Sequence, residues 1–192
     1  MDRQHMRNRH TMRIKDFDYS QPGGYFVTIC TKHRLYLFGE IFREEMRLSS
    51  VCEIAKRFWL EIPKYFPNTE LDEFVIMPNH IHAIIIINSS VVGIHHNESL
   101  RKHSYQHIIP YSLGSIIRSY KGAVYRECRR QGYDDFYWQR NYYEHIIRND
   151  KDLNNIRDYI EGNISKWEID KDNHSISDFR TIPGLSQLRR DG

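Results

Sequence analysis

The chain has 192 residues, with 28 lysines and arginines against 25 aspartates and glutamates and a formal net charge of +3. Hydrophobic residues make up 40% of the chain, enough for a folded core, so wholesale disorder is excluded. The longest apolar run, 83–87, is far shorter than a membrane helix, and the charged N-terminal segment is not a secretory signal. Three scattered cysteines argue against a disulfide scaffold and a cysteine-type zinc site. We therefore expect a cytoplasmic protein with no membrane partner.

The first third of the chain predicts a basic arm, a strand, a short hairpin and a helix. Residues 1–18 are rich in cations and read as an N-terminal arm. Residues 25–31 are rich in β-branched and aromatic side chains, which favours a strand. The irregular segment 35–48 is compatible with a short hairpin. Ser50 begins a capping box, and the helical spacing of apolar residues behind it continues until Pro63.

The middle of the chain has the clearest strand pattern. Two runs of strand-forming residues, 73–77 and 80–87, are separated by the turn signal Pro78-Asn79. The second run is nearly all isoleucine, which predicts a hairpin in the centre of a sheet. Residues 89–111 hold four histidines among polar residues without a clear period. We expect this segment to be an insertion loop.

The last third predicts a helix, a strand, a second helix and a tail. Ser112 begins a helix with one apolar face, and Gly132 ends it. Residues 136–148 alternate loosely and favour a further strand. Asn149 opens a final helix that carries an apolar stripe. The polar, aperiodic residues 169–192 are expected to form a loosely attached tail.

These elements define the expected fold. Strands and helices mix within a single domain of residues 19–168, and at least one strand pair is an antiparallel hairpin. This order predicts an α+β protein. We expect a ferredoxin-like antiparallel sheet with helices packed on one face.

A His-x-His pair on the isoleucine-rich strand is the main candidate for chemistry. Residues two apart on a strand point to the same face, so His80 and His82 project side by side. Two imidazoles at that spacing suit one divalent metal ion. The competing interpretation is structural, although two imidazoles in a core need polar partners.

The final helix offers a second pair of polar residues. Tyr159 and Asn163 lie one turn apart, beside the apolar stripe, where they stay near the sheet. The amide oxygen of Asn163 suits a metal site, and Tyr159 is then held one turn away. The alternative is a tyrosine that packs at the edge of the core. Tyr142 and Tyr143 are rival nucleophiles on a predicted strand.

Cations cluster in the arm and on the helix that begins at Ser112. The helix has five cations opposed by Glu127 alone, interleaved with tyrosines, which fits a groove for phosphates and stacked bases. A solvated helix face is the alternative. The predicted DNA contacts are Arg13, Tyr25, Arg118, Lys121, Arg126, Arg129, Arg130, Arg140 and Tyr143.

Several motifs in a fixed order resemble one family. They are MPNHIHA at 77–83, GYFVT at 24–28, WQR at 138–140, YEHIIR at 143–148, and DYI at 158–160 followed by Asn163. Together they resemble the REP-associated tyrosine transposases, which belong with the single-tyrosine transposases of the HUH class. The resemblance spans 19–167. The histidine pair alone is only moderately specific for this family, whereas all of these motifs in this order are strongly specific for it.

The resemblance implies a site and a substrate. His80 and His82 correspond to the metal ligands, Tyr159 to the nucleophile, and Asn163 to a polar residue that helps bind the metal. The implied cofactor is Mg²⁺ or Mn²⁺, and the implied partner is single-stranded or hairpin DNA on a ferredoxin-like sheet. The 89–111 insertion and the 169–192 tail depart from the family pattern. They leave DNA specificity, and the choice between monomer and homodimer, open.

The expected reaction is a transesterification. A phenol of pKa ~10 is a poor nucleophile at neutral pH, and a bound metal ion would polarise the scissile phosphate. Attack by Tyr159 would give a 5′-phosphotyrosine and a free 3′-OH, so rejoining needs no ATP. One alternative is a non-catalytic DNA-binding or regulatory protein on the same scaffold. Another is a small-molecule metallohydrolase that uses Glu144 as its acid or base.

Overall fold

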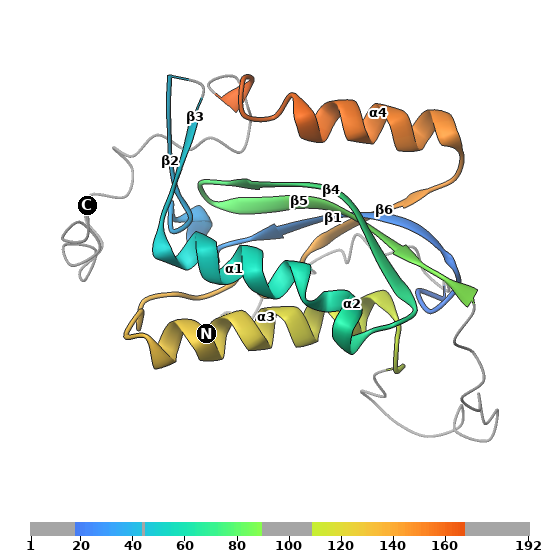
Figure 1. Ribbon diagram of the computed structural model, residues 1–192, viewed down its shortest axis with the longest axis horizontal. Helices are drawn as coiled ribbons and strands as arrows, with labels where there is room; N and C mark the ends of the chain where they lie inside the picture. Colours follow the sequence, from blue (N-terminus) through green and yellow to red (C-terminus); the bar gives the residue numbers. More distant parts are fainter. Residues whose placement is uncertain (1–17, 44, 90–108, 168–192) are drawn as a thin grey trace, which may run out of the picture.

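The computed structural model describes residues 18–43, 45–89 and 109–167, which form a four-stranded antiparallel sheet flanked by helices (Figure 1). The sheet contains β1 (Gly23–Cys30), β4 (Thr69–Met77), β5 (His80–Ile87) and β6 (Tyr143–Ile147). The helices are α1 (Ser50–Leu60), α2 (Ile62–Tyr65), α3 (Leu113–Arg130) and α4 (Asp150–Glu161). After β1 come a short 3-10 turn, η1 (Lys32–Arg34), and a separate hairpin of β2 (Gly39–Phe42) and β3 (Glu45–Leu48).

The connections between strands make the sheet ferredoxin-like. The strand order is β4-β5-β1-β6, and each neighbouring pair is antiparallel. The chain passes from β1 through α1 to β4 with β5 lying between these strands, and from β5 through α3 to β6 with β1 between them. Two such split crossovers define the βαββαβ arrangement. The predicted α+β class and the central place of the isoleucine-rich strand are therefore confirmed.

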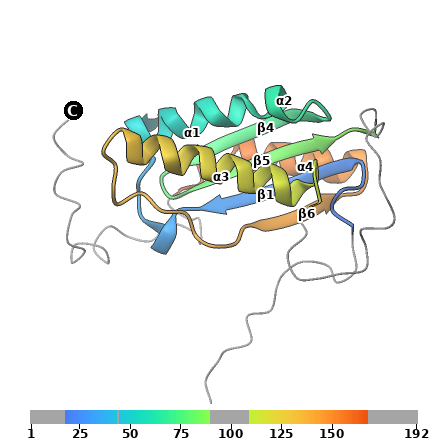
Figure 2. The ribbon, with the colours of Figure 1, turned by 90° about the horizontal axis from the view of Figure 1, so that it is seen from below.

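The helices cover both faces of the sheet, so the expectation that they pack on one face is wrong. Helices α1 and α3 lie together against one face, and α4 lies across the other (Figures 1 and 2). The cause is β5, which is apolar on both sides. Ile81 and Ile85 join the main core under α1 and α3, whereas Ile84 packs with Phe26 and Ile160 under α4. A strand that is apolar on both faces needs a cover on each.

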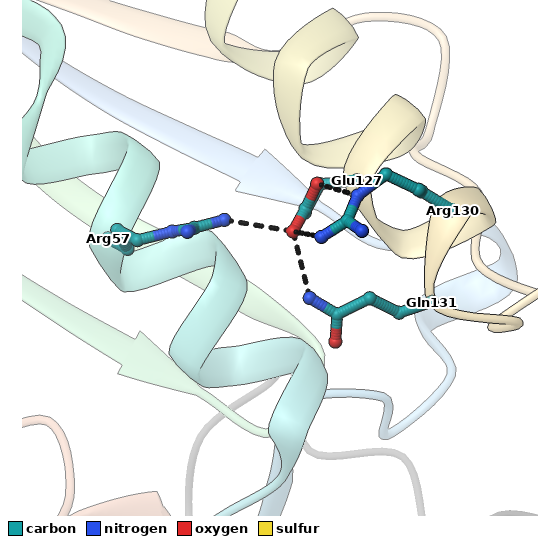
Figure 3. A network of polar contacts seen from close by, with 4 residues as sticks. All are labelled: Arg57, Glu127, Arg130 and Gln131. Atoms are coloured by element: carbon teal, nitrogen blue, oxygen red, sulfur yellow. Dashed lines mark hydrogen bonds and ion pairs between the residues drawn. The ribbon is translucent and has the colours of Figure 1, made fainter.

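The main core lies between the sheet and the α1–α3 layer. The buried Trp59 ring meets Tyr120 edge to face at 5.1 Å, and the Tyr120 hydroxyl donates to the carbonyl of Ala55. Outside this core, Arg57 of α1 donates to Glu127 of α3, which also accepts from Arg130 and Gln131 (Figure 3). These donors hold the pKa of Glu127 at about 2. The network ties the two helices together at the surface.

Side-chain caps set the helix starts. Ser112 accepts from the amide of Ser115, and Asn149 accepts from that of Asp152, as their positions in the sequence predict. The first helix differs by one residue, because Ser49 rather than Ser50 is the cap and accepts from the amide of Cys52 at 3.1 Å. The predicted strand at 136–148 is shorter than expected and covers only β6.

Three predicted segments fall largely outside the described residues. They are the 1–18 arm, the 89–111 insertion and the 169–192 tail. Arg13, one of the predicted DNA contacts, falls there as well. Within the part of the chain that is described, no helix combines the length and apolar character needed to cross a membrane.

Candidate active site

The register of the sheet places the two histidines on the face that α4 covers. His80 pairs with Cys30 and His82 with Thr28 across the β1–β5 ladder, at the end of the sheet where β5 begins. Both histidines alternate with Ile81, which belongs to the main core on the opposite face. His80 is 0% and His82 3% exposed. The prediction that the pair projects from one face of a buried strand is confirmed by the register.

Each imidazole is oriented by a hydrogen bond from its Nδ1 side. Asn79 Oδ1 lies 2.6 Å from His80 Nδ1, and because an amide oxygen only accepts, His80 Nδ1 carries the hydrogen. Thr28 Oγ1 lies 2.9 Å from His82 Nδ1. The two Nε2 atoms then point at each other, 2.9 Å apart. Such outer partners hold the rings of metal-binding histidines in many proteins.

The environment of the pair keeps His80 neutral. Burial lowers the pKa of His80 well below its ordinary value, and the charges of His82 and Arg34 act in the same direction. A neutral imidazole is the form that binds metal ions. Two nitrogen lone pairs at 2.9 Å need a shared hydrogen or a cation between them. Nitrogens that share one cation at about 2.0–2.1 Å lie roughly 3 Å apart when adjacent, so the spacing fits a metal ion.

Tyr159 extends from α4 toward the same point. Its hydroxyl lies 3.2 Å from His82 Nε2, and its ring lies edge-on to His82 at 5.2 Å. Phe26, which stacks on His82 at 5.4 Å, also meets the Tyr159 ring edge-on. Tyr159 is nevertheless 42% exposed. The hydroxyl is therefore held beside the histidine pair while the side chain stays open to a ligand from solvent.

Asn163 supplies an oxygen in the same region. It is 3% exposed, and its Nδ2 donates to the carbonyl of Tyr159 at 3.2 Å. Its Oδ1 is buried and accepts no hydrogen bond from the described residues. Asn163 lies four residues after Tyr159, which contacts His82, and four before Trp167, whose ring lies 6.1 Å from His80. A buried amide oxygen in this position suits a hard divalent cation.

The three polar residues therefore fit a metal ion by the chemistry of their donors. Among the described residues, no three His, Cys, Asp or Glu side chains cluster in a way that could hold a metal. The set here is instead two imidazoles and an amide oxygen, with further positions left for a phosphate or water. Mg²⁺ and Mn²⁺ accept oxygen ligands and commonly keep open positions for substrate.

Two side-chain pairs tie α4 to the sheet. Arg157 donates to both carboxylate oxygens of Asp72 on β4, and this bond lowers the pKa of Asp72. His145 of β6 lies 3.0 Å from Asp152 in the first turn of α4. These contacts orient the helix that carries Tyr159.

The rival residues near 142–145 are divided between the faces of the sheet. Tyr142 packs on the α3 side, as does the buried Glu144, whose pairing partner Val27 belongs to the main core. Tyr143 faces the α4 side, with its ring 6.4 Å from Phe26. Glu144 is thus separated from the histidine pair by the sheet, which contradicts its proposed role as an acid or base beside the metal. Tyr143 shares the face of Tyr159, where its ring lies beside Phe26.

The predicted DNA contacts do not form one surface. Tyr25 is wrong as a contact, since it is 1% exposed, its ring belongs to the main core, and its hydroxyl donates to the carbonyl of Gln21. Its alternation with Val27 and Ile29 was a sequence signal for burial. The remaining described cations lie on or near α3, across the sheet from the histidine pair.

These cations divide further by their partners. Arg129 forms an ion pair with Asp134, and Arg130 forms one with Glu127. Arg118, Lys121 and Arg140 instead line one cavity, and Arg126 is exposed further along α3. The tertiary structure thus gathers Arg118, Lys121 and Arg140 around a cavity whose described lining has no carboxylate, whereas Arg126 and Arg130 lie beside Glu127.

Three residues of the site were not predicted from the sequence. Asn79 was assigned to the turn, yet it orients His80. Thr28 reaches His82 only through the β1–β5 register, so no local pattern reveals it. Trp167, whose ring lies 6.1 Å from that of His80, is four residues after Asn163. This helical spacing is a sequence signal that the face carrying Tyr159 and Asn163 continues beyond α4.

Comparisons with known proteins agree with this arrangement. No protein-family model matches the chain. An uncharacterized protein of Haemophilus influenzae is 40% identical over 169 residues, which cover 85% of this chain and 92% of that protein. A solved structure, a REP-associated tyrosine transposase bound to a REP hairpin, has a TM-score of 0.53 at 20% identity and covers 80% of this chain and 73% of its own. This likeness shows the shared fold.

A second curated protein of Haemophilus influenzae carries the name "Putative REP-associated tyrosine transposase". It is 30% identical to this chain over 151 residues, which cover 74% of this chain and 70% of that protein. The identity extends over most of both chains. This chain therefore belongs to the family of REP-associated tyrosine transposases.

Proposed function

We propose that this protein is a metal-dependent transposase that cleaves and rejoins single-stranded DNA next to hairpins through a 5′-phosphotyrosine on Tyr159. One observation carries the proposal: the Tyr159 hydroxyl lies 3.2 Å from Nε2 of His82, where the Nε2 of His80 also converges. The candidate nucleophile and the two candidate imidazole ligands thus meet at one point, where the histidines are buried and Tyr159 is open to solvent. Family membership supports a transposase-like role in DNA processing.

The metal ion is assigned to His80, His82 and Asn163. The buried Asn163 Oδ1 and the two facing Nε2 atoms are electron-pair donors of the kinds that bind a divalent cation, which supports this assignment. A bound Mg²⁺ or Mn²⁺ would polarise the scissile phosphate and neutralise the charge that builds on it. Asn79 and Thr28 would keep both imidazoles in the orientation that binding needs.

Tyr159 performs the covalent step. Its phenolic oxygen forms a bond to phosphorus while the bond between phosphorus and the 3′ oxygen breaks, leaving a free 3′-OH on the other fragment. The exposed position of Tyr159 lets solvent take the phenol proton and supply one to the leaving oxygen. The number of phosphate ester bonds is unchanged, so a second 3′-OH can displace the tyrosine and rejoin the strand.

DNA with a hairpin is the proposed substrate. The solved relative of this fold is bound to a REP hairpin, and that supports a similar partner here. Tyr143, 38% exposed on the same face as Tyr159, offers a ring on which an unpaired base can stack. A perfect duplex keeps its bases inside and offers mainly phosphates, so a single strand with a hairpin should bind better.

The decisive experiment traps the covalent adduct. The protein is incubated with Mg²⁺ and a labelled single strand from the flank of its gene, and the products are run on a denaturing gel. Wild type should give a protein–DNA adduct that EDTA abolishes. Tyr159→Phe should give none while it still binds the strand, because the lost hydrogen bond costs only about 1 kcal/mol of stability.

Matched variants identify the nucleophile and the ligands. Tyr142→Phe and Tyr143→Phe remove the same atom and should keep adduct formation. His80→Ala and His82→Ala should abolish cleavage, and Asn163→Ala should weaken it less severely. Peptide mapping that finds the phosphotyrosine at 142 or 143 would overturn the assignment of Tyr159. DNA binding without any adduct in wild type would favour a non-catalytic, regulatory protein instead.

A further inference from the structure

A cationic cavity lies across the sheet from Tyr159. It has a volume of about 290 Å³ and lies between α3 and the segment 139–142. Gly114, Arg118, Lys121, Arg140 and Tyr142 are among its lining residues. Its described lining holds three cations and no carboxylate. We call it the α3 cavity. Its volume is close to the lower end for small-molecule sites, which suits a single nucleotide unit.

The cations of the α3 cavity are positioned but not neutralised. Lys121 Nζ donates to the carbonyls of Gln139 and Arg140, at 2.6 and 3.3 Å. Burial lowers the pKa of Lys121 to about 8, so an anion next to it would stabilise its charged form. Among the described residues, neither Arg118 nor Arg140 forms an ion pair with a carboxylate. The cavity therefore holds positive charge in excess.

The wall of the cavity also offers an aromatic ring and open space. Tyr142 lines the cavity, and a base can stack on its ring or edge. Gly114, in the first turn of α3, leaves the space beneath the Tyr142 hydroxyl open. A Cβ atom at position 114 would lie 4.0 Å from that hydroxyl and 3.8 Å from Ser112 Oγ. The contacts leave room for substitution, and a long side chain there would occupy the cavity.

The α3 cavity and Tyr159 lie near the same end of the sheet. The amide of Gln139 donates to the carbonyl of Cys30, and Cys30 is the pairing partner of His80. Tyr142 directly precedes β6 and Tyr143 begins it, yet Tyr142 packs on the cavity side and Tyr143 on the Tyr159 side. Strand β6 is the edge of the sheet. A chain of nucleotides can therefore pass from one face to the other over this edge.

We propose that the α3 cavity binds one unstacked nucleotide, phosphate and base, of the same DNA strand whose scissile phosphate lies at Tyr159. The strand crosses the edge at the start of β6. The ligand is part of the substrate, so this site rests on the proposed function. Arg118 and Arg140 contact the phosphate, and Tyr142 contacts the base. A duplex cannot fill the cavity in this way because its bases remain stacked in the helix.

Photocrosslinking tests the contact with the base. Single strands from the flank of the gene carry 5-iododeoxyuridine at one position each, stepped along the strand. They are bound in EDTA to Tyr159→Phe protein, so that no cleavage intervenes, and irradiated. Crosslinks are expected at Tyr142 from one or two adjacent positions only. If no position of the strand crosslinks to Tyr142 in this protein, or if every position does so equally, the proposal is overturned.

A cavity-filling variant tests the space without changing charge. Gly114→Leu should weaken binding of the single strand by roughly tenfold or more, the range for one lost stacked base, and leave duplex binding unchanged. The matched control is Gly122→Leu, where the added Cβ meets only the flexible end of Arg126 at 3.2 Å. Equal effects of both variants, or equal effects on single strand and duplex, would refute a nucleotide site. Circular dichroism checks that each variant is folded.

A charge variant tests the phosphate contact. Arg118→Gln/Arg140→Gln should weaken single-strand binding and reduce its salt slope, by about 0.7 for each lost phosphate contact. Lys56→Gln/Lys64→Gln removes two exposed cations from α1 and α2 and should change the slope much less. Similar slopes for both pairs would refute the proposal. These assays measure binding and do not depend on adduct formation. If wild type forms no adduct but Tyr142 still crosslinks, the proposed chemistry is refuted and the proposed binding of a nucleotide in the cavity is retained.

Discussion

Substituting Ile160 by alanine should detach α4 from the sheet without unfolding the sheet. Ile160 is the buried residue of α4, 2% exposed, and it packs with Phe26 and Ile84 in a small cluster apart from the main core. A buried Ile→Ala change costs about 2–5 kcal/mol. Phe26 and Ile84 are themselves buried, but the hydrophobic side chains packed around this cluster are only partly buried and can partly collapse into the space, so we expect about 2–3 kcal/mol.

The other contacts between α4 and the sheet compensate little for this lost packing free energy. The ion pair between Asp72 and Arg157 joins side chains that are 12% and 38% exposed, and such a pair contributes less than about 1 kcal/mol. A loss of 2–3 kcal/mol raises the population with α4 detached roughly 30- to 150-fold. Since Tyr159 lies on α4, the hydroxyl loses its place beside His82 in that population. The sheet and the α1–α3 layer keep their own core.

Hydrogen exchange followed by mass spectrometry measures this effect. In Ile160→Ala, peptides from α4 should exchange roughly 30- to 150-fold faster, while peptides from β5 should change little. The control is Ile116→Ala in the main core, where β5 and α3 should be affected together. An equal rise in α4 and β5 for Ile160→Ala would show that α4 opens only with the whole domain, and the reasoning would fail.

Three further predictions concern charged groups. Asp72→Asn should speed exchange in α4 by less than about fivefold, since Arg157 is partly exposed; a larger rise would show that the ion pair, not the apolar cluster, holds the helix. The pKa of Glu127 is lowered to about 2, so its stabilising effect is complete above about pH 4.5 and is lost as the pH falls toward 2. The difference in melting temperature between wild type and Glu127→Gln should therefore shrink over that range, and a constant difference would contradict the network. The pKa of Lys121 is lowered to about 8, so its charge is present below that pH and disappears above it. Single-strand affinity should fall between about pH 7 and pH 9 in wild type but not in Lys121→Met, and identical pH profiles would exclude Lys121 as an anion contact.

The sequence alone determined the local structure of this protein. Caps at Ser112 and Asn149 and the turn at Pro78-Asn79 were predicted correctly, because hydrogen bonds between near neighbours set them. The placement of His80 and His82 on one face follows from strand alternation, which needs no knowledge of the rest of the fold. The Tyr159–Asn163 pair likewise follows from helical periodicity.

Only the tertiary structure decided which face of the sheet each helix covers. Periodicity shows that Leu153, Ile156 and Ile160 share a stripe, but not which side of the sheet that stripe covers. The side depends on how the chain leaves β6, and the isoleucine-rich β5 accepts a helix on either face. The expectation of helices on one face was wrong for this reason.

The same limit applies to the polar residues. Strand alternation puts the adjacent Tyr143 and Glu144 on opposite faces, but only the pairing of β6 with β1 shows that Tyr143 shares the face of Tyr159. The alternation of Tyr25 with Val27 and Ile29 indicates that these three side chains share a face, but only the assembled sheet shows that this face is the one buried under α1 and α3. The approach of Thr28 to His82 and of Tyr159 to the same ring joins residues 54 and 77 positions apart. Contacts over such distances are set by strand pairing and helix packing, which depend on the whole chain, so residue spacing alone cannot reveal them.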